Sequence, residues 1–456
     1  MKERIYYPVT SGQMIMFYTA KFSPRKQITN VCATINITTP LDEALLCQAL
    51  TMAVMRFPTL NCRLTMQGEK IVQYFDDEFP TNLRLVDMSD KSEAEIQAQI
   101  NEWSAEPFPN KNMDVPLWRI HVLRMPDGTH SLYFCVCHMV MDAYAMMSCV
   151  KYMADVYHAL QDGQPIPAIK ATPLECYKND YAYFTGPRYA RDTQWWNDQF
   201  ATEPMYTSLN GRKSKDFVRG KRYGVTLHPA KTVADHLNLR IPKESVGQAN
   251  QLAALLEVSP QCVYTMAVRS YLAAVSETDD VTLISAVARR ATLAQKYGGG
   301  TMVNAIPLRT IYPASTSLRE GMEIVHRAQS GIFRHADFPC GQILQDLAKR
   351  YNVPMSALSL HGYVTVSMTY QPYFSFDDTG FKCTFKREKT GTAATPLYMS
   401  IMPYDGSGDL WVNYDYLVDR LSPETLEKLH NFMLRFFEKG LAQPDLTLAE
   451  LTEQCL

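Results

Sequence analysis

A histidine followed four residues later by an aspartate is the pattern in this chain most suited to acid–base chemistry. His138 and Asp142 lie in a stretch that starts with alternating apolar residues and continues into a helical pattern. An imidazole exchanges protons near neutral pH, so His138 is a candidate general base. Two structural explanations compete: His138 as a hydrogen-bonded core histidine, and Asp142 as the N-cap of the following helix. Because His-x-x-x-Asp is short enough to arise by chance, its setting has to decide.

The surrounding elements place His138 at the rim of a predicted sheet. Asp127-Gly128 is a typical hairpin turn between two alternating runs. By the two-residue period of a strand, His138 continues an apolar face formed by Leu132, Phe134 and Val136. Residues 143–160 follow with apolar side chains at helical spacing, which predicts a helix. A histidine that closes an apolar strand face just before a helix is well placed for catalysis.

The segment resembles the His-His-x-x-x-Asp-Gly motif of the chloramphenicol-acetyltransferase-like superfamily, which includes the condensation domains of nonribosomal peptide synthetases. His138 and Asp142 match the second His and the Asp. Cys137 stands in place of the first His, and Ala143 in place of the closing Gly. The resemblance implies that His138 is the base, and that Asp142 turns away from the pocket to pair with an arginine. Arg290 is the expected partner and Arg289 the alternative.

Further blocks resemble condensation domains, and they occur in the family's order along nearly the whole chain. Gly300–Arg309 is similar to the family's Gly-x-x-Val-Asn-Thr-x-Pro-Leu-Arg motif, and Val364–Gln371 to its Val-Ser-Phe-Asn-Tyr-Gln motif. Their positions imply that Asn304 and Ser367 line the pocket. The other reading of both side chains is that they only satisfy backbone groups.

The resemblance also implies the architecture. We expect an α/β (α+β) fold of two chloramphenicol-acetyltransferase-like lobes, each a mixed sheet flanked by helices, with the active site in a tunnel between them. A loop-like stretch after residue 160 places the boundary near residue 175. The predicted domains are therefore an N-terminal lobe, residues 1–175, and a C-terminal lobe, residues 176–456. The polar excursion at residues 372–395 corresponds to the family's latch.

The composition argues against some classes of partner and indicates the cellular compartment. A formal net charge of -2 gives no electrostatic basis for binding nucleic acid. No run of about 18 apolar residues predicts a membrane span, and the N-terminus lacks the apolar region of a signal peptide. The 11 cysteines are scattered without a Cys-x-x-Cys pair, which predicts no metal site and indicates a reducing cytoplasm.

The expected reaction is direct acyl transfer. The donor is a phosphopantetheine thioester, on a carrier protein or on coenzyme A, and the acceptor is a small-molecule amine or alcohol. No permanently bound cofactor is expected. No adenylation signature or carrier segment is recognisable, so the chain is expected to meet an acyl or peptidyl carrier protein in trans. Cys137 points away from His138 on a regular strand, which argues against a cysteine acyl-enzyme.

The alternative function is a different class of protein. In that reading the chain is a catalytically silent condensation-like protein that recruits a carrier protein or another partner. The departures at Cys137 and Ala143 support it, because alanine adds a methyl group beside the thioester and disfavours a positive φ. Replacing His138 by alanine separates the two readings: an enzyme loses transfer and keeps binding, whereas a recruiter shows no transfer in either form.

Overall fold

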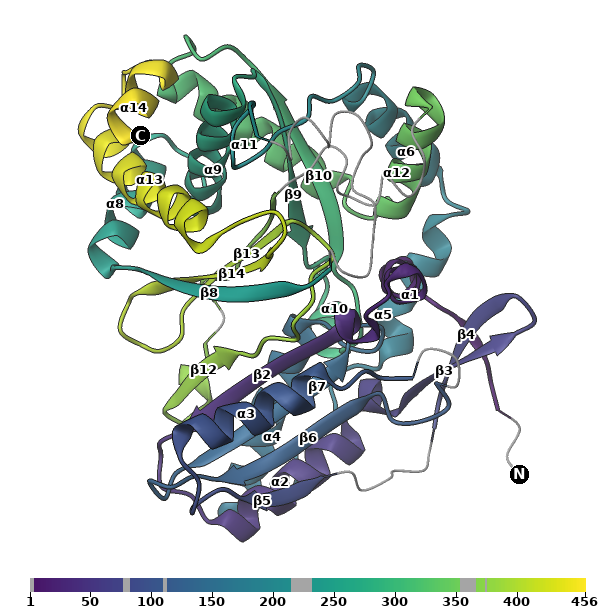
Figure 1. Ribbon diagram of the computed structural model, residues 1–456. Coiled ribbons are helices and arrows are strands. Elements are labelled where there is room, and N and C mark those ends of the chain that lie inside the picture. The colour runs from purple at the N-terminus through teal and green to yellow at the C-terminus, as the bar shows by residue number, and fades with distance from the viewer. Residues whose placement is uncertain (1–3, 77–82, 110–112, 215–231, 353–365, 374) are drawn as a thin grey trace. The chain divides into compact units, whose positions relative to one another are not determined.

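The computed structural model describes residues 4–76, 83–109, 113–214, 232–352, 366–373 and 375–456, which form two compact units (Figure 1). The first unit comprises Met1–Gly186, Ala288–Val303 and Phe374–Thr392. The second comprises Pro187–Val287, Asn304–Tyr373 and Ala393–Leu456. Each unit thus combines separate stretches of the chain, and the division into lobes 1–175 and 176–456 stays a prediction.

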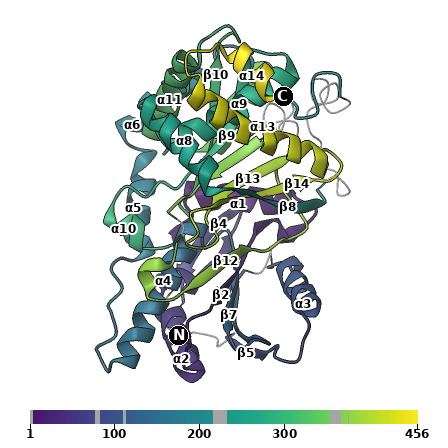
Figure 2. The same ribbon diagram turned by 90° about the vertical axis from the view of Figure 1, so that its left-hand side faces the viewer.

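The first unit is built on a mixed five-stranded sheet. Its order is β12 (Cys383–Arg387), β2 (Asn30–Ile37), β7 (His130–Cys137), β6 (Trp118–Arg124) and β5 (Arg84–Asp87). Only β5 and β6 pair in parallel within it. Helix α3 (Glu93–Ala105) lies on one face, and α2 (Glu43–Arg56) and α4 (Ala143–Gln161) lie on the other (Figure 2). Strand β7, which leads to His138, is therefore central and buried.

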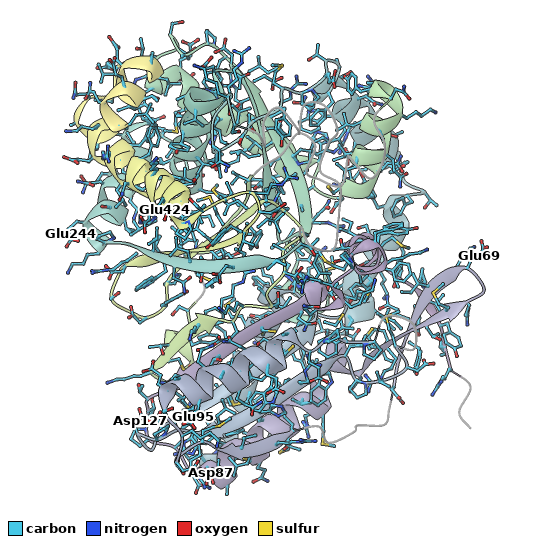
Figure 3. The ribbon with its side chains drawn as sticks, in the orientation of Figure 1. Glu69, Asp87, Glu95, Asp127, Glu244 and Glu424 are labelled. Carbon is cyan, nitrogen blue, oxygen red and sulfur yellow. The ribbon has the colours of Figure 1, made fainter. Side chains whose placement is uncertain are left out.

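The hairpin that joins β6 to β7 sets their register. Gly128 has a φ of 80°, and the Asp127 carboxylate accepts a hydrogen bond from the Thr129 N–H at 3.0 Å. Figure 3 labels Asp127 at this turn. With this turn in place, Ile120 pairs with Phe134, and Trp118 with Val136. The hairpin signal in the sequence is confirmed, and β7 ends at Cys137, one residue before His138.

Helix starts follow side-chain caps, with one correction. Ser92 and Glu95 match the Ser-x-x-Glu pattern of a capping box, and this box begins α3, where Figure 3 labels Glu95. The run Thr39-Pro40-Leu41-Asp42 predicts a helix with Thr39 as N-cap and Pro40 at its first position. The structure instead uses Asp42 as the cap of α2, and its carboxylate accepts from the Leu45 N–H at 2.9 Å. Asparagine, aspartate and serine are stronger N-caps than threonine, and Asp42 is the later cap-type residue in the run.

The segment predicted as a latch contributes an edge strand to the first unit. Within residues 372–395, strand β12 pairs antiparallel with β2, so that Phe385 lies opposite Ile35. Residue 374 lies outside the described residues. The strand places Arg387 opposite Ala33, in the half of β2 that leads back toward the His138 end of β7.

The first unit contains further short strands and helices, one of which, α10, belongs to the segment at residues 288–303. They are β1 (Tyr7–Pro8), α1 (Ser11–Phe22), η1 (Lys26–Thr29), η2 (Pro58–Asn61), β3 (Cys62–Gln67), β4 (Lys70–Phe75), α5 (Pro173–Tyr183), α10 (Leu293–Tyr297) and η4 (Asp377–Thr379). Strands β1, β4 and β3 form a second, three-stranded antiparallel sheet. Helices α1, α5 and α10 bring three distant parts of the chain into one unit.

The second unit has a mixed six-stranded sheet. Its order is β10 (Asn304–Ile311), β9 (Asp280–Val287), β11 (Val366–Tyr370), β13 (Leu397–Met402), β14 (Leu410–Leu417) and β8 (Ala234–Ile241). Its helices are α6 (Pro187–Gln199), α8 (Lys243–Leu255), α9 (Pro260–Ser276), α11 (Leu318–Arg334), α12 (Cys340–Tyr351), α13 (Pro423–Ala442) and α14 (Leu448–Cys455). Two mixed sheets with flanking helices confirm the predicted α/β (α+β) class.

One glycine in this unit serves close packing. Gly440 lies inside α13, which continues to Ala442. A Cβ at Gly440 would lie 3.2–3.8 Å from side-chain carbons of Leu252, Leu318 and Leu451. Glycine therefore lets α13 approach α8, α11 and α14. No helix in the described ranges is both long enough and apolar enough to cross a membrane.

Candidate active site

The main chain of His138 is held on both sides. His138 is the first residue after β7, and its N–H donates to the Thr29 carbonyl at 2.7 Å. Its own carbonyl accepts a hydrogen bond from the Thr301 hydroxyl at 2.5 Å. Thr301 belongs to the segment 288–303 of the same unit. The position of the imidazole thus depends on β7, on the last residue of η1 (Lys26–Thr29) and on this distant segment.

The imidazole itself is set up to be neutral. His138 is half-buried, and its Nδ1 is a buried atom without a hydrogen-bond partner among the described residues. Burial lowers the pKa of His138 below its ordinary value, and nearby Arg387 acts in the same direction. The Asp142 carboxylate and the residue's own carbonyl oppose this shift. A neutral imidazole at pH 7 is the form that accepts a proton.

Asp142 is a buried carboxylate that joins three parts of the first unit. It caps α4 by accepting from the Ala145 N–H at 2.9 Å. It also accepts from the Met302 N–H at 3.0 Å and the Val303 N–H at 3.2 Å. Burial alone would raise the pKa of Asp142, but the Arg290 guanidinium and these donors hold that pKa below its ordinary value. Asp142 is therefore an anion that fixes the start of α4 against residues 302–303.

Arg290 is the partner of Asp142. Its Nη2 donates to both carboxylate oxygens, at 2.7 and 2.8 Å, and also to the Gly300 carbonyl at 2.8 Å. Its Nη1 donates to the carbonyls of Gln295 and Gly299. One guanidinium nitrogen therefore serves both carboxylate oxygens, and the other serves the loop. Both side chains are almost fully buried, at 2% and 4% exposure.

The loop around Arg290 requires its glycines. Gly299 and Gly300 have φ values of 72° and 79°, which non-glycine residues rarely adopt. A Cβ at Gly300 would lie 2.0 Å from the Tyr177 hydroxyl, and one at Gly299 would lie 2.2 Å from the Thr59 hydroxyl. The carbonyls of these glycines are the ones that accept from Arg290. The glycine run is thus a close-packed turn around a guanidinium.

The two departures from the family motif are accommodated locally. Ala143 is the first residue of α4 and does not have a positive φ, so its methyl group imposes no backbone strain. Cys137 is fully buried, and its Sγ lies 3.7 Å from the Thr29 hydroxyl. Burial raises the pKa of Cys137 to about 11, so its thiol is protonated at neutral pH. A protonated, enclosed thiol is poorly suited to act as a nucleophile.

Asn304 and Ser367 lie in the second unit. The Asn304 amide donates to the carbonyls of Ala336 and Phe338 at 2.9 and 2.8 Å, and its oxygen accepts from the Cys340 N–H at 3.4 Å. These contacts favour the reading in which Asn304 satisfies backbone groups. Ser367 is 5% exposed on β11, opposite Tyr398. Its neighbours Val366 and Met368 face the helix-covered core, so Ser367 points to the other face of the sheet.

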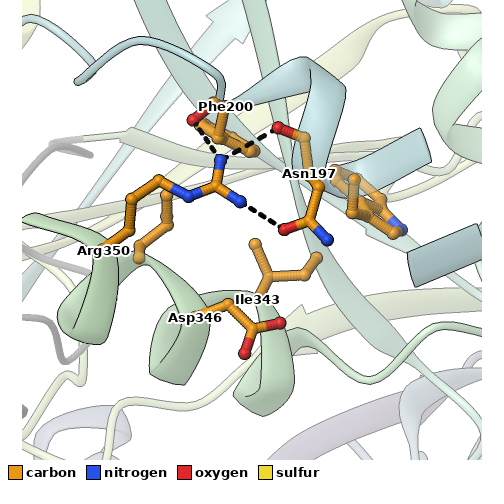
Figure 4. A pocket seen from close by; sticks show the side chains of 7 residues that line it. Asn197, Phe200, Ile343, Asp346 and Arg350 are labelled. Atoms are coloured by element: carbon orange, nitrogen blue, oxygen red, sulfur yellow. Dashed lines mark hydrogen bonds between the residues drawn. The ribbon is translucent and has the colours of Figure 1, made fainter. Parts of the chain in front are cut away.

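A separate pocket occurs in the second unit, between α6 and α12 (Figure 4). It is a small depression, partly open to solvent, and its lining includes Ile343, Asp346 and Arg350. Arg350 donates to the Asn197 carbonyl at 3.0 Å and to the Phe200 carbonyl at 2.7 Å, as the dashed lines show. The Arg350 guanidinium thus connects α12 to the end of α6. None of the predicted site residues lines this pocket.

Sequence reasoning missed a second buried ion pair in the first unit. Arg289 does not contact Asp142 but donates from Nη2 to Asp180 at 2.6 Å and from Nη1 to the Ser11 hydroxyl at 3.1 Å. It also missed Thr301, the donor to the His138 carbonyl. Adjacent arginines were a visible signal, but nothing in the sequence marks Asp180 as the partner. The described residues contain no cluster of His, Cys, Asp and Glu placed to hold a metal ion.

Comparisons with solved structures identify the class of fold. The first condensation domain of the calcium-dependent antibiotic synthetase, in complex with substrate analogue 3a, has a TM-score of 0.82 and 23% identity, covering 98% of both chains. A variant of the starter condensation domain of rhizomide synthetase, in complex with C8-CoA, has a TM-score of 0.80 and 19% identity, covering 97% of this chain and 96% of that one. The fold is therefore that of condensation domains.

The family follows from the sequence match. The profile of the family described as "Condensation domain" matches residues 3–453, so this chain belongs to the condensation-domain family. Surfactin synthase subunit 1 of Bacillus subtilis (strain 168) is 23% identical over 458 residues, covering 99% of this chain and 12% of that protein. Tyrocidine synthase 3 of Brevibacillus parabrevis is 22% identical over 458 residues, covering 99% of this chain and 7% of that protein. The chain thus spans only a small part of the length of these relatives. Condensation domains form amide bonds from carrier-bound thioesters.

Proposed function

We propose that this chain is an acyltransferase of the condensation type, with His138 as its general base. The observation that carries the proposal is the fixed geometry around this imidazole. The main chain of His138 is held by Thr29 and Thr301, and the start of the following helix is locked by Asp142 and Arg290. The lowered pKa of His138 keeps the ring in its proton-accepting form at neutral pH.

The proposed reaction is a direct transfer. The nucleophilic nitrogen or oxygen of the acceptor attacks the thioester carbonyl while the His138 ring takes its proton. The tetrahedral intermediate then expels the pantetheine thiolate, which receives that proton from the imidazolium. Because Nδ1 is buried, Nε2 is the nitrogen that we assign to this exchange. No acyl-enzyme is formed, in agreement with the protonated state of Cys137.

The remaining site residues support the base in this proposal. Asp142 and Arg290 hold the loop, and Ala143 lies where that loop becomes α4. Asn304 and Ser367 remain candidate pocket residues, although the contacts of Asn304 fit a structural role better.

The donor in this proposal is an acyl or aminoacyl thioester of phosphopantetheine. The rhizomide synthetase starter domain was solved with C8-CoA, which makes a coenzyme A thioester a suitable first probe. The relatives among peptide synthetases favour a carrier protein that presents the same thioester in trans. The acceptor is a small-molecule amine or alcohol, and no permanently bound cofactor is required.

The test measures transfer and binding on the same samples. Wild-type protein is mixed with C8-CoA or C8-loaded carrier protein and a panel of amines and alcohols, and products are identified by mass spectrometry. We expect H138A to abolish product while carrier-protein binding is kept. The matched control is H130A, at the other end of β7, where His130 pairs with Glu43 at 3.1 Å. Binding without transfer in any form, wild type included, would instead support the silent recruiter.

A further inference from the structure

Two consecutive arginines in the first unit reach different buried carboxylates. Arg290 donates to Asp142, as described above, and Arg289 donates to Asp180 of α5 at 2.6 Å. The side chains of Arg289 and Asp180 are only 4% and 3% exposed. The proposed mechanism uses the first pair and leaves the second unexplained. A second buried ion pair one residue away requires a reason, because burying charges is costly unless their geometry is well satisfied.

The backbone of Arg289 explains how neighbouring side chains diverge. Arg289 has a φ of 54°, in the left-handed region that residues with a Cβ rarely adopt. Such strain persists only where surrounding contacts determine the conformation. Among the contacts of Arg289 are its hydrogen bonds to Asp180 and to the Ser11 hydroxyl. At this turn of the backbone the two side chains part, with Arg289 reaching Asp180 and Arg290 reaching Asp142.

Asp180 is also connected to the segment 288–303 through Ser11 and the start of α1. Its two oxygens accept from the Ser11 N–H at 2.9 Å and the Ser11 hydroxyl at 2.8 Å, which fixes the first turn of α1. At the next residue, a Cβ on Gly12 would lie 3.2 Å from the Thr301 carbonyl and 3.1 Å from the Val303 carbonyl. Helix α1 therefore lies directly against residues 301–303. Those residues supply the Thr301 hydroxyl to His138 and two N–H groups to Asp142.

We infer that Asp180 is a positioning residue for the His138 site: through Arg289 and Ser11 it fixes the segment 288–303, which holds Asp142 and the His138 main chain. This inference rests on the proposed function, because it assigns Asp180 to the same site. Asp180 contacts neither His138 nor Asp142 in the structure, so it acts through the residues between them.

The first test replaces the charge and follows kcat and KM separately. We expect D180N to lower kcat by about tenfold or more with the donor KM within about twofold, because misplacing a catalytic group slows chemistry without removing a substrate contact. The matched control is D192N in the second unit, where Asp192 is fully buried and accepts from His335 at 2.7 Å. D192N is expected to lower thermal stability and to leave kcat within about twofold. Equal effects of both variants on kcat would overturn the inference.

A second test isolates the backbone of Arg289. The double variants D180N/R289G and D180N/R289A both remove the Arg289 guanidinium, but only glycine adopts the left-handed conformation without strain. We expect the glycine variant to recover at least about threefold more kcat than the alanine variant. Equal kcat values in the two double variants would show that the left-handed turn does not transmit the effect.

Hydrogen exchange separates this inference from the proposed function. In D180N, the amides at 143–147 and 300–303 are expected to exchange at least about fivefold faster than in wild type, while the amides of β6 exchange at the wild-type rate. In the double variant D180N/R289G, the protection of these amides is expected to be restored. Unchanged exchange at these amides would refute the positioning role whatever the activity. Faster exchange in D180N, combined with a wild-type protein that shows no transfer, would uphold the positioning role and refute the proposed function. If D180N does not fold, S11A is measured instead, with a smaller change in the same direction expected.

Discussion

One nitrogen of Arg290, Nη2, donates to both carboxylate oxygens of Asp142, at 2.7 and 2.8 Å. This leaves Nη1 for the carbonyls of Gln295 and Gly299. The same carboxylate caps α4 and accepts from two N–H groups at residues 302–303. A single ion pair therefore joins the helix that follows His138 to the segment that binds the His138 carbonyl.

Arg290→Lys is expected to damage both stability and transfer. Lysine keeps the charge but has no planar group to reach the carboxylate and the carbonyls of Gln295, Gly299 and Gly300 together. Buried carbonyls left without donors give an expected loss of about 2–4 kcal/mol in the free energy of unfolding. We expect kcat to fall by about tenfold or more. Urea unfolding and steady-state kinetics measure the two effects.

The control for this prediction is Arg124→Lys. Arg124 is 39% exposed and pairs with Glu43 and Asp87 at 2.7 and 2.6 Å. Exposed ion pairs contribute little, so the expected change is below about 1 kcal/mol with unchanged transfer. If R290K were as mild as R124K, the Asp142–Arg290 pair would not be what holds the site.

The pH dependence of transfer is expected to follow the lowered pKa of His138. Only the neutral ring accepts a proton, so kcat/KM is flat at neutral pH and falls as the pH drops through the folded-state pKa. Because burial lowers that pKa, the midpoint of the acidic limb lies below 6.5. A pH–rate profile of kcat/KM measures this midpoint. The acceptor is an alcohol, because its own protonation does not change over this pH range. A midpoint above 6.5 would contradict the assignment.

Acid stability is expected to follow the same two groups. The folded state resists protonation of His138, while the unfolded chain takes up that proton near its ordinary pKa, so stability declines as the pH falls below about 6.5. The lowered pKa of Asp142 contributes stability that is present above about pH 4 and is lost as the pH falls through the folded-state value. Urea unfolding midpoints measured between pH 3 and 8 test both losses of stability. D142N is expected to lack the loss that occurs below about pH 4.

Cys137→Ser is expected to leave transfer within about threefold of wild type. The thiol is enclosed, contacts the Thr29 hydroxyl and has a pKa of about 11. Serine is nearly isosteric and retains a hydroxyl for that contact. Intact-protein mass spectrometry with donor alone is expected to show no acyl adduct on the wild type. A stable adduct that is lost in C137S would replace direct transfer by an acyl-enzyme route.

Gly300→Ala is expected to destabilise the first unit strongly. A Cβ there combines a φ of 79° with a contact of 2.0 Å to the Tyr177 hydroxyl. Gly128 is the matched control, because its φ of 80° is nearly the same and a Cβ there meets nothing within 4 Å. We expect about 1–2 kcal/mol for G128A from the backbone alone. G300A should exceed this by at least about 1 kcal/mol from the steric overlap, as measured by urea unfolding, and equal losses would contradict the close packing.

Local signals in the sequence were sufficient for the elements that carry His138. Turn residues and alternating apolar positions predict the hairpin, the end of β7 and the helix at 143–160, because these features depend on neighbours in the chain. Local rules selected Thr39 as the cap of α2, whereas the structure uses Asp42, and the error arose because both residue types cap helices.

Side-chain pairs between distant parts of the sequence could be predicted only where the family resemblance indicated both partners. Asp142 and Arg290 are 148 residues apart, and their pairing was expected from the motif order. Asp180 and Arg289 are 109 residues apart, and no period or turn rule connects them. Asn304 was placed in the pocket by its motif, but side-chain contacts with three main-chain groups are visible only in the folded structure.

The most direct test of the account is the single-turnover rate of acyl transfer from C8-CoA or a C8-loaded carrier protein in wild type, H138A and H130A. If His138 is the base, H138A slows product formation by at least about a hundredfold while H130A stays within about twofold of wild type. Equal rates for wild type and H138A would contradict the central claim that this imidazole takes the proton of the acceptor.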